Sequence, residues 1–141
     1  LTERQNIVYR TSFLYNLKKK YRIKMPSHSD RMTTQILKQI NSLQDFDDKY
    51  TAAAHGFDDA FDYYRKNSSR QFLPNITIPV LILNAQNDTF LSEECYPSAL
   101  ASNSKNIYLE TPKHGGHVGF HQSNKIYYSE SRALEFINSK Q

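Results

Sequence analysis

Two residues whose side chains could transfer protons together each follow a short apolar segment. Asp88 lies in NAQNDTFLS, directly after IPVLIL, and His117 lies in HGGHVGF, shortly after NIYLETP. In open sheets of parallel strands, functional side chains gather just beyond the carboxyl ends of adjacent strands. A carboxylate and a histidine that meet there can act as an orienting acid and a general base. We therefore expect Asp88 and His117 to lie within hydrogen-bonding distance.

The residue pattern alone leaves other interpretations open. Asp88 has the position of a helix cap or an Asx-turn residue, and His117 could simply occupy a glycine-rich turn. His114, His117 and His121 have a spacing that would suit three metal ligands, but the glycines between them disfavour a helix that would align them. Cys95 could pair with His117 as a thiolate, although no neighbouring residue in the sequence would activate it. We expect neither a metal nor a cofactor.

The apolar segments in the second half of the chain predict two strands. PVLILNA and NIYLETP are short runs of β-forming residues, and the lack of alternation in PVLILNA is typical of a central parallel strand covered on both faces by helices. SEECYPSALASNS should form a short helical or turn crossover. NKIYYSESRALEFINSK should form a last helix that directs Ile126, Ala133, Leu134 and Ile137 inward. This order of elements predicts the α/β class.

The first half of the chain predicts helices only. Apolar residues at helical spacing favour one helix over residues 3–21, which Pro26 prevents from continuing. A second helix is expected over residues 29–43, with Ser29 or Asp30 as its N-cap.

A third helix is expected from about Phe57 to Lys66. Its apolar residues Phe57 and Phe61 are spaced four apart, as are its acidic residues Asp58 and Asp62. We expect the acids to form a solvated face and the aromatic residues an apolar one.

Composition places the chain among globular domains without a membrane span. Its 141 residues are 38% hydrophobic, which is enough for a core. No segment approaches the roughly 20 apolar residues of a membrane helix. The single cysteine excludes an internal disulfide framework and favours a cytoplasmic location.

The formal net charge of +4 is concentrated near the N-terminus, where KKKYRIK covers residues 18–24. Cations at the end of a helix usually form a solvated face that complements the helix dipole. The alternative is a basic helix that binds an acidic partner or nucleic acid. Because no pattern of a known nucleic-acid module accompanies the cluster, we expect no nucleic-acid partner.

Together, these segments resemble the C-terminal half of a YheT-type α/β-hydrolase. The segments that carry the resemblance are IPVLILNAQNDTFLS, CYP, NIYLETPKHGGHVGF and YYSESRALEFI, with FDDKYTAAAHGFDDAFDYY upstream. The resemblance implies a partial α/β-hydrolase fold, in which residues 1–75 form a helical cap segment and its return to the core, and residues 76–141 form the C-terminal part of the core. It also implies that Asp88 and His117 are the acid and the histidine of a Ser-Asp-His triad. Thr89 departs from a proline that is common in the family, and His114 from an aromatic residue.

The serine of such a triad is not expected in this chain. A nucleophile elbow G-x-S-x-G needs two glycines four positions apart, and only Gly115 and Gly119 have that spacing, on either side of His117. Two strands are also fewer than the roughly four to six of a typical sheet. We therefore expect the nucleophile, the oxyanion hole and most of the sheet in a missing N-terminal half, and an isolated chain that is inactive and self-associates.

The resemblance further implies a serine esterase, in which an upstream serine attacks the ester, His117 moves the proton and Asp88 holds the imidazole. The aromatic residues Phe61, Tyr63 and Tyr64 would suit an apolar pocket for the acyl group of a small-molecule ester, and they would serve equally well in packing. The alternative function is a non-catalytic interaction module that uses the basic N-terminal helix.

Overall fold

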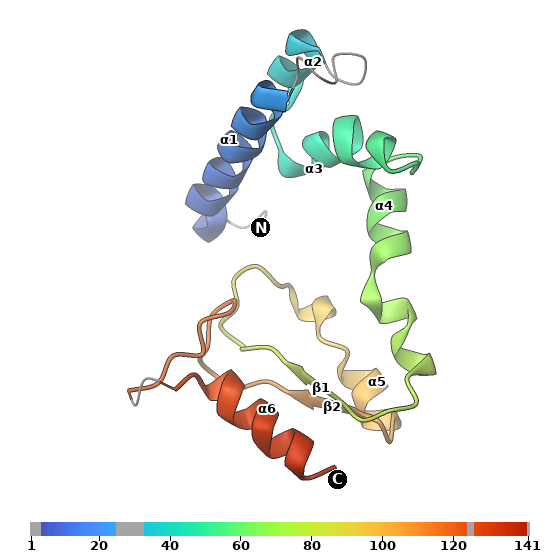
Figure 1. The fold of residues 1–141 in the computed structure, drawn as a ribbon, viewed down its shortest axis with the longest axis vertical. Coiled ribbons are helices and arrows are strands. Elements are labelled where there is room, and N and C mark those ends of the chain that lie inside the picture. Colours follow the sequence, from blue (N-terminus) through green and yellow to red (C-terminus); the bar gives the residue numbers. More distant parts are fainter. Residues whose placement is uncertain (1–3, 25–32, 124–125, 141) are drawn as a thin grey trace. The chain divides into compact units, whose positions relative to one another are not determined.

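The computed structural model describes residues 4–24, 33–123 and 126–140 (Figure 1). The chain divides into two compact units, Leu1–Ser68 and Ser69–Gln141. The expected N-cap at Ser29 or Asp30 lies outside the described residues. The assignment of residues 1–75 to a cap and 76–141 to a hydrolase core stays a prediction.

In its described part, the first unit is helical and packs around a small aromatic and aliphatic core. Its elements are the 3-10 turn η1 (Arg4–Asn6), α1 (Ile7–Lys24), α2 (Thr34–Gln39), α3 (Leu43–Phe46), the π-helical segment η3 (Asp47–Ala52) and α4 (Ala60–Asn67). The core consists of Tyr21, Leu37, Ile40 and Phe46, all at most 5% exposed. Tyr50 lies against the core with its ring centroid 4.6 Å from that of Tyr21. This burial of apolar surface connects α1 to α2 and α3.

The second predicted helix is divided into α2 and α3. The hydroxyl of Thr33 caps α2, and the backbone becomes extended at Ile40. Ser42 then starts α3, because its Oγ accepts the backbone N–H of Asp45 at 2.9 Å while the Asp45 carboxylate accepts the N–H of Ser42 at 3.0 Å. The prediction of one continuous helix over residues 29–43 was wrong, since this capping box satisfies the backbone of a new helix start.

Helix α4 buries an acid and exposes an aromatic ring, the reverse of the predicted faces. Asp62 is 6% exposed, whereas Phe61 is 66% exposed. The Asp62 carboxylate pairs with Arg65 and with Lys66, whose Nζ lies 2.7 Å from Oδ2, and it accepts the backbone N–H of Asp58 at 3.4 Å. The prediction of a solvated face containing Asp62 was wrong, because two cations and an amide at the helix start replace its water.

The basic cluster of α1 has a structural role for at least one of its members. Lys18 donates to the carbonyl of Ile40, which follows the last residue of α2. A cation at this position satisfies a carbonyl that the helix leaves without a partner and complements the helix dipole. Lys19 and Lys20 are exposed.

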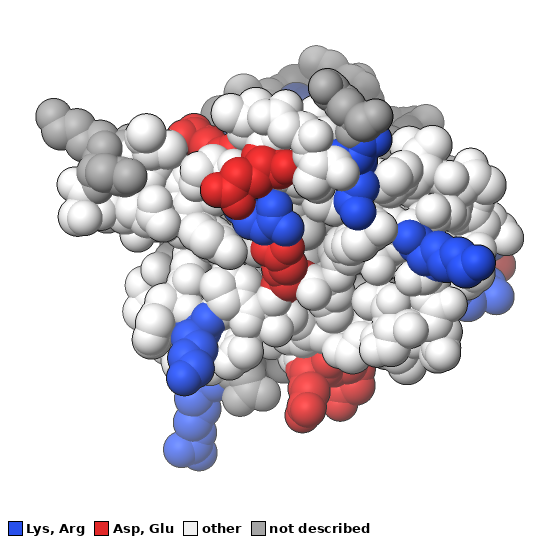
Figure 2. Space-filling view, turned by 90° about the horizontal axis from the view of Figure 1, so that it is seen from below, with Lys and Arg blue, Asp and Glu red and all other residues white. Residues whose placement is uncertain are grey.

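On the face drawn in Figure 2, basic and acidic side chains are interspersed on a mostly uncharged surface.

The second unit is built on two parallel strands. They are β1 (Val80–Leu83) and β2 (Ile107–Glu110), which pair in a register that runs from Val80 opposite Ile107 to Leu83 opposite Glu110. The other elements are the 3-10 turns η4 (Ser69–Gln71), η5 (Leu73–Asn75) and η6 (Glu93–Cys95), the crossover helix α5 (Ser98–Asn103) and α6 (Tyr128–Asn138). Helices α5 and α6 lie on opposite sides of the strands (Figure 1). The predicted α/β class and order of elements are confirmed.

Strand β1 is less covered than its sequence suggests. All four of its residues are only half-buried. In the described part of the chain, β2 is the one strand that pairs with it. Helices α5 and α6 lie on opposite sides of the strands, as predicted (Figure 1), but they leave β1 half-buried, because a two-stranded sheet and two short helices provide too little surface to bury it.

Helix α6 packs on the sheet through a face that was not predicted. Its ring at Phe136 meets Tyr108 of β2 edge-on at 5.2 Å, and Arg132 Nε lies 2.8 Å from an oxygen of Glu110. Tyr108 and Glu110 are two apart and so share one face of the strand. The prediction that the residues Ile126, Ala133, Leu134 and Ile137 point inward was wrong: all four are exposed. The bidentate ion pair and the aromatic contact fix the rotation of the helix instead.

None of the described helices combines the length and the apolar character required to cross a bilayer.

Asp62→Asn should destabilise the first unit at neutral pH. Hydrogen bonding to Lys66 lowers the pKa of Asp62 from 3.8 to about 2, with help from Arg65 and against the effect of burial. A lowered pKa in the folded state contributes stability above the unfolded pKa, and this contribution is lost as the pH falls through the folded pKa. The difference in unfolding midpoint between the two proteins should therefore be full above about pH 4 and shrink towards pH 2.

The measurement is urea unfolding followed by circular dichroism across this pH range. Asp58→Asn is the matched control, because Asp58 is an exposed acid at the same helix start. A difference that does not depend on pH would contradict the role assigned to the Asp62 charge.

Candidate active site

Asp88 and His117 meet at the carboxyl ends of the two strands. Oδ2 of Asp88 lies 2.9 Å from Nδ1 of His117. Asp88 follows β1 and His117 follows β2, so the parallel pairing brings both to the same edge of the sheet. The prediction that these two side chains come within hydrogen-bonding distance is confirmed.

The carboxylate of Asp88 is shielded from water and held from both sides. Its side chain is 1% exposed. Oδ1 accepts the backbone N–H of Phe90 at 2.8 Å, which is the Asx-turn arrangement, while Oδ2 faces His117. The turn and the histidine contact therefore use different oxygens of the same group. Asp88 can therefore close the Asx-turn and orient His117 at the same time.

This arrangement determines which nitrogen of His117 can act as a base. An ionised carboxylate only accepts hydrogen bonds, so Nδ1 of His117 donates to Asp88 when the imidazole is neutral. The free electron pair is then on Nε2, on the other side of the ring. The His117 side chain is 51% exposed. A reacting group could therefore reach Nε2 without displacing Asp88.

The loop that carries His117 is closed by hydrogen bonding and anchored by an aromatic ring. Phe120 donates its N–H to the carbonyl of Gly115 at 2.9 Å, and Gly116 has a φ of +59°. Phe120 itself has a φ of +41°, an uncommon value for a residue with a side chain. Its buried ring stacks on Tyr128 of α6, with centroids 6.4 Å apart. This anchor fixes the loop to α6.

Phe90 also restricts the imidazole, a role that no sequence pattern predicted. Its ring centroid is 4.7 Å from that of His117, with the planes tilted by 42°. Because Phe90 also donates its N–H to Asp88, one residue touches both members of the pair.

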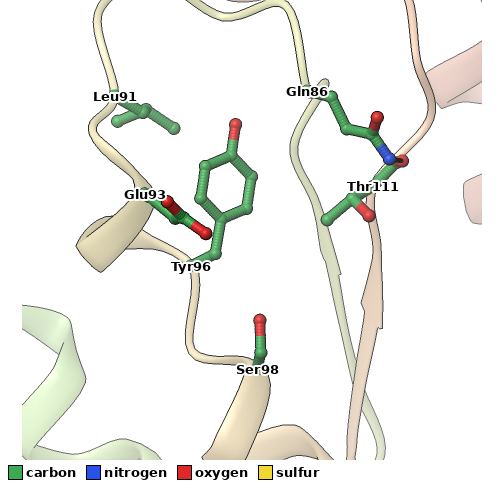
Figure 3. A pocket seen from close by; sticks show the side chains of 6 residues that line it. All are labelled: Gln86, Leu91, Glu93, Tyr96, Ser98 and Thr111. Atoms are coloured by element: carbon green, nitrogen blue, oxygen red, sulfur yellow. Dashed lines mark hydrogen bonds between the residues drawn. The ribbon is translucent and has the colours of Figure 1, made fainter.

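A cavity of about 390 Å³ lies beside the strand ends (Figure 3). Its lining residues are Gln86, Leu91, Glu93, Tyr96, Ser98 and Thr111. Two of the polar groups at its wall are already used. Tyr96 donates to the carbonyl of Ala85 at 2.7 Å, and Gln86 Nε2 donates to the carbonyl of Thr111 at 2.8 Å. Burial, assisted by the Asp88 charge, raises the pKa of Tyr96 and keeps its phenol a donor. The Gln86 bond thus connects the two strand exits, and the Tyr96 bond connects the crossover to the exit of β1.

The residues expected to line an acyl pocket belong to the first unit. Tyr64 donates to Asp47 at 2.6 Å, and Tyr63 packs edge-on against Phe57 at 5.3 Å. Both contacts are internal packing. Phe61 is exposed, and the acyl pocket stays a prediction.

The alternative chemistries are not assembled among the described residues. There, no three His, Cys, Asp or Glu side chains lie close enough together to hold a metal ion, and this includes the set His114, His117 and His121. The Sγ of Cys95 is exposed and lies 3.6 Å from the hydroxyl of Ser92. Among the described residues, the side chain that contacts the thiol of Cys95 is therefore Ser92 and not His117.

Comparison with known proteins relates the chain to hydrolases. It is 39% identical to YheT of Escherichia coli strain K12, which has a provisional esterase name, over 60% of this chain and 24% of that protein. It is 34% identical to phospholipase ABHD3 of Mus musculus, over 79% of this chain and 26% of the relative. It is 29% identical to an abhydrolase domain-containing protein of Dictyostelium discoideum, over 95% and 34%. The chain is related to the α/β-hydrolase family.

The resemblance to YheT-type hydrolases is thereby confirmed. The matched regions amount to about a quarter to a third of the length of these relatives. No protein-family profile matches the chain, and no solved structure does.

Gly115→Ala should disturb the loop that carries His117. A Cβ at this position would lie 2.6 Å from two ring atoms of Phe120 and 2.9 Å from Cβ of Ala85, so that the buried ring or the backbone must move. We expect a loss of about 1–3 kcal/mol in the free energy of unfolding, as for other overpacked sites. Denaturant unfolding measures it. Gly119→Ala is the control, because a Cβ at that position would come no closer than 3.2 Å to a neighbouring atom, the carbonyl oxygen of Gly115. Equal stability of Gly115→Ala and the unchanged protein would contradict this packing.

Proposed function

We propose that this chain supplies the acid and the general base of a serine hydrolase that acts on carboxylic esters. The observation that carries the proposal is the buried Asp88 carboxylate, which has one oxygen on the Phe90 amide and the other 2.9 Å from Nδ1 of His117. The names of relatives support the reaction class, since they include a phospholipase and a monoacylglycerol lipase. Both names denote ester hydrolysis.

In this mechanism, Nε2 of His117 removes the proton from a serine hydroxyl as that oxygen attacks the acyl carbon. The imidazolium then gives the proton to the leaving alcohol, and an acyl-enzyme remains. Water attacks the acyl-enzyme, with His117 again accepting and returning the proton. Asp88 holds the tautomer and stabilises the imidazolium in both halves of the reaction.

The serine and the oxyanion hole would come from outside these 141 residues. The sequence has no G-x-S-x-G segment, and the glycine pair with that spacing encloses His117. The proposed partner is the N-terminal half of the same α/β-hydrolase fold, which would add strands beside β1 and cover its half-buried residues. Residues 1–75 would then form the cap segment and 76–141 the end of the core. The proposed substrate is a small ester with an apolar acyl group.

His117→Ala in the full-length protein should abolish most ester hydrolysis, because it removes the general base. Asp88→Asn should reduce kcat by on the order of 10⁴-fold, the loss for the same change in serine proteases, because an amide can stabilise the wrong tautomer. A p-nitrophenyl ester series of increasing acyl length measures both effects and the preference for apolar acyl groups. His114→Ala and Cys95→Ala are the controls and should retain activity.

Labelling with a fluorophosphonate separates this mechanism from one in which the chain acts alone. The full-length protein should form a covalent adduct, and the 141-residue chain should not, since a serine without an activating base is a poor nucleophile. Ester hydrolysis by the isolated chain that is lost on Cys95→Ala or with a chelator would overturn the proposal.

The isolated chain should self-associate, because we propose that the rest of the fold also covers the apolar side chains of α6, which are exposed without it. On α6, Leu134 is 62% and Ile137 56% exposed. Light scattering should give a mass above that of a monomer. Replacing both residues by Lys should shift the mass towards the monomer, whereas Ser139→Lys, at the end of the same helix, should not. A monodisperse monomer of the unchanged chain would contradict this surface.

A further inference from the structure

The side chain of Asn87 connects the two loops that carry Asp88 and His117. Its Oδ1 accepts the backbone N–H of Gly115 at 3.0 Å and that of Gly116 at 2.9 Å. Asn87 precedes Asp88 directly in the chain, and Gly116 precedes His117 directly. One oxygen therefore sets the spacing between the two backbone segments, one residue away from each member of the pair.

The glycine loop is shaped to receive such an acceptor. Successive backbone N–H groups converge on one point when a residue adopts the left-handed conformation, and Gly116 has a φ of +59°. The same loop is closed by the bond from the Phe120 N–H to Gly115. Gly115 therefore carries both the attachment to Asn87 and the closure of the loop. The position of His117 between Gly115 and Phe120 depends on both.

Among the described residues, the other hydrogen bonds between the strand exits do not involve the backbone of Gly115 or Gly116. Gln86 donates from its side chain to Thr111 and from its backbone to Pro112, so it connects the same two segments closer to the strands. Asp88 contacts the side chain of His117, whereas Asn87 accepts hydrogen bonds from the backbone of the loop.

We propose that Asn87 is a positioning residue, which holds the glycine loop so that Nδ1 of His117 faces Asp88. The inference rests on the proposed function and deepens it, since Asn87 itself would touch no reacting atom. Asn87 is exposed, so water can replace its hydrogen bonds and its removal should cost little stability. Its effect should instead be on the orientation of the imidazole.

The tautomer of His117 provides a test that does not depend on activity. We would label the histidines of the full-length protein with ¹⁵N and record the ring nitrogens at about pH 9, where an ordinary imidazole is neutral. His117→Gln identifies the signals. In the unchanged protein, Nδ1 should carry the proton. In Asn87→Ala, the ring should lose this preference and populate the Nε2–H form, which is favoured in water.

Two variants serve as controls. Asn87→Asp retains an oxygen that can accept both amides and should restore the Nδ1–H form. Gln86→Ala removes the neighbouring connection between the strand exits and should leave the tautomer unchanged. If Asn87→Ala does not fold, Asn87→Ser, whose shorter side chain cannot span both amides, is measured in its place.

Kinetics give a second readout. Asn87→Ala should lower kcat by roughly 10- to 100-fold, the range for a small misplacement of a catalytic group, with KM nearly unchanged. Asn87→Asp should recover most of kcat.

The outcomes separate the two proposals. An Nδ1–H form that persists in Asn87→Ala, with unchanged kcat, would overturn the role of Asn87 and leave the proposed function intact. An Nε2–H form in the unchanged protein would overturn the Asp88–His117 pair, and with it both proposals.

Discussion

The parallel pairing of β1 and β2 is the constraint on which the rest of the candidate site depends. With Val80 opposite Ile107 and Leu83 opposite Glu110, both strands end at the same level. Backbone bonds continue this ladder into the exits, from Asn84 to the Glu110 carbonyl at 3.1 Å. Because this spacing is fixed by regular hydrogen bonds, two side chains 29 positions apart in sequence can meet at 2.9 Å.

Support for the site is distributed over contacts of different strength. The carboxylate of Asp88 is buried and has two hydrogen-bond partners. Removal of either partner would leave a desolvated charge with one hydrogen bond fewer. The histidine is half exposed and depends on its loop, which is held by the ring of Phe120 within the protein and by Asn87 at the surface. This asymmetry suits a general base, because the acid must stay fixed while the imidazole must stay accessible.

The comparison with hydrolases and the residues of this chain both correspond to one part of a hydrolase. The chain matches only a quarter to a third of its relatives, and it contains an acid and a histidine at the strand exits without a nucleophile elbow. In the proposed function, the exposed apolar side chains on α6 and the half-buried strand β1 would be covered by the rest of the hydrolase fold. The first unit, by contrast, has its own core around Tyr21 and Ile40.

The sequence by itself determined the features that depend on local composition. The apolar run before Asn84 predicted β1, the run before Pro112 predicted β2, and the types and positions of Asp88 and His117 predicted their meeting. These predictions succeeded because strand propensity and the shared edge of parallel strands require no knowledge of side-chain packing.

Only the tertiary structure decided which faces are buried and which polar groups meet. Helix α6 carries aliphatic residues on one side and Arg132 with Phe136 on the other, and the contacts with Glu110 and Tyr108 selected the second. The role of Asn87 depends on hydrogen bonds to Gly115 and Gly116, which are 28 and 29 positions away in sequence. Hydrophobic periodicity cannot anticipate such choices, because the free energy of an ion pair or a buried ring depends on partners that are distant in sequence.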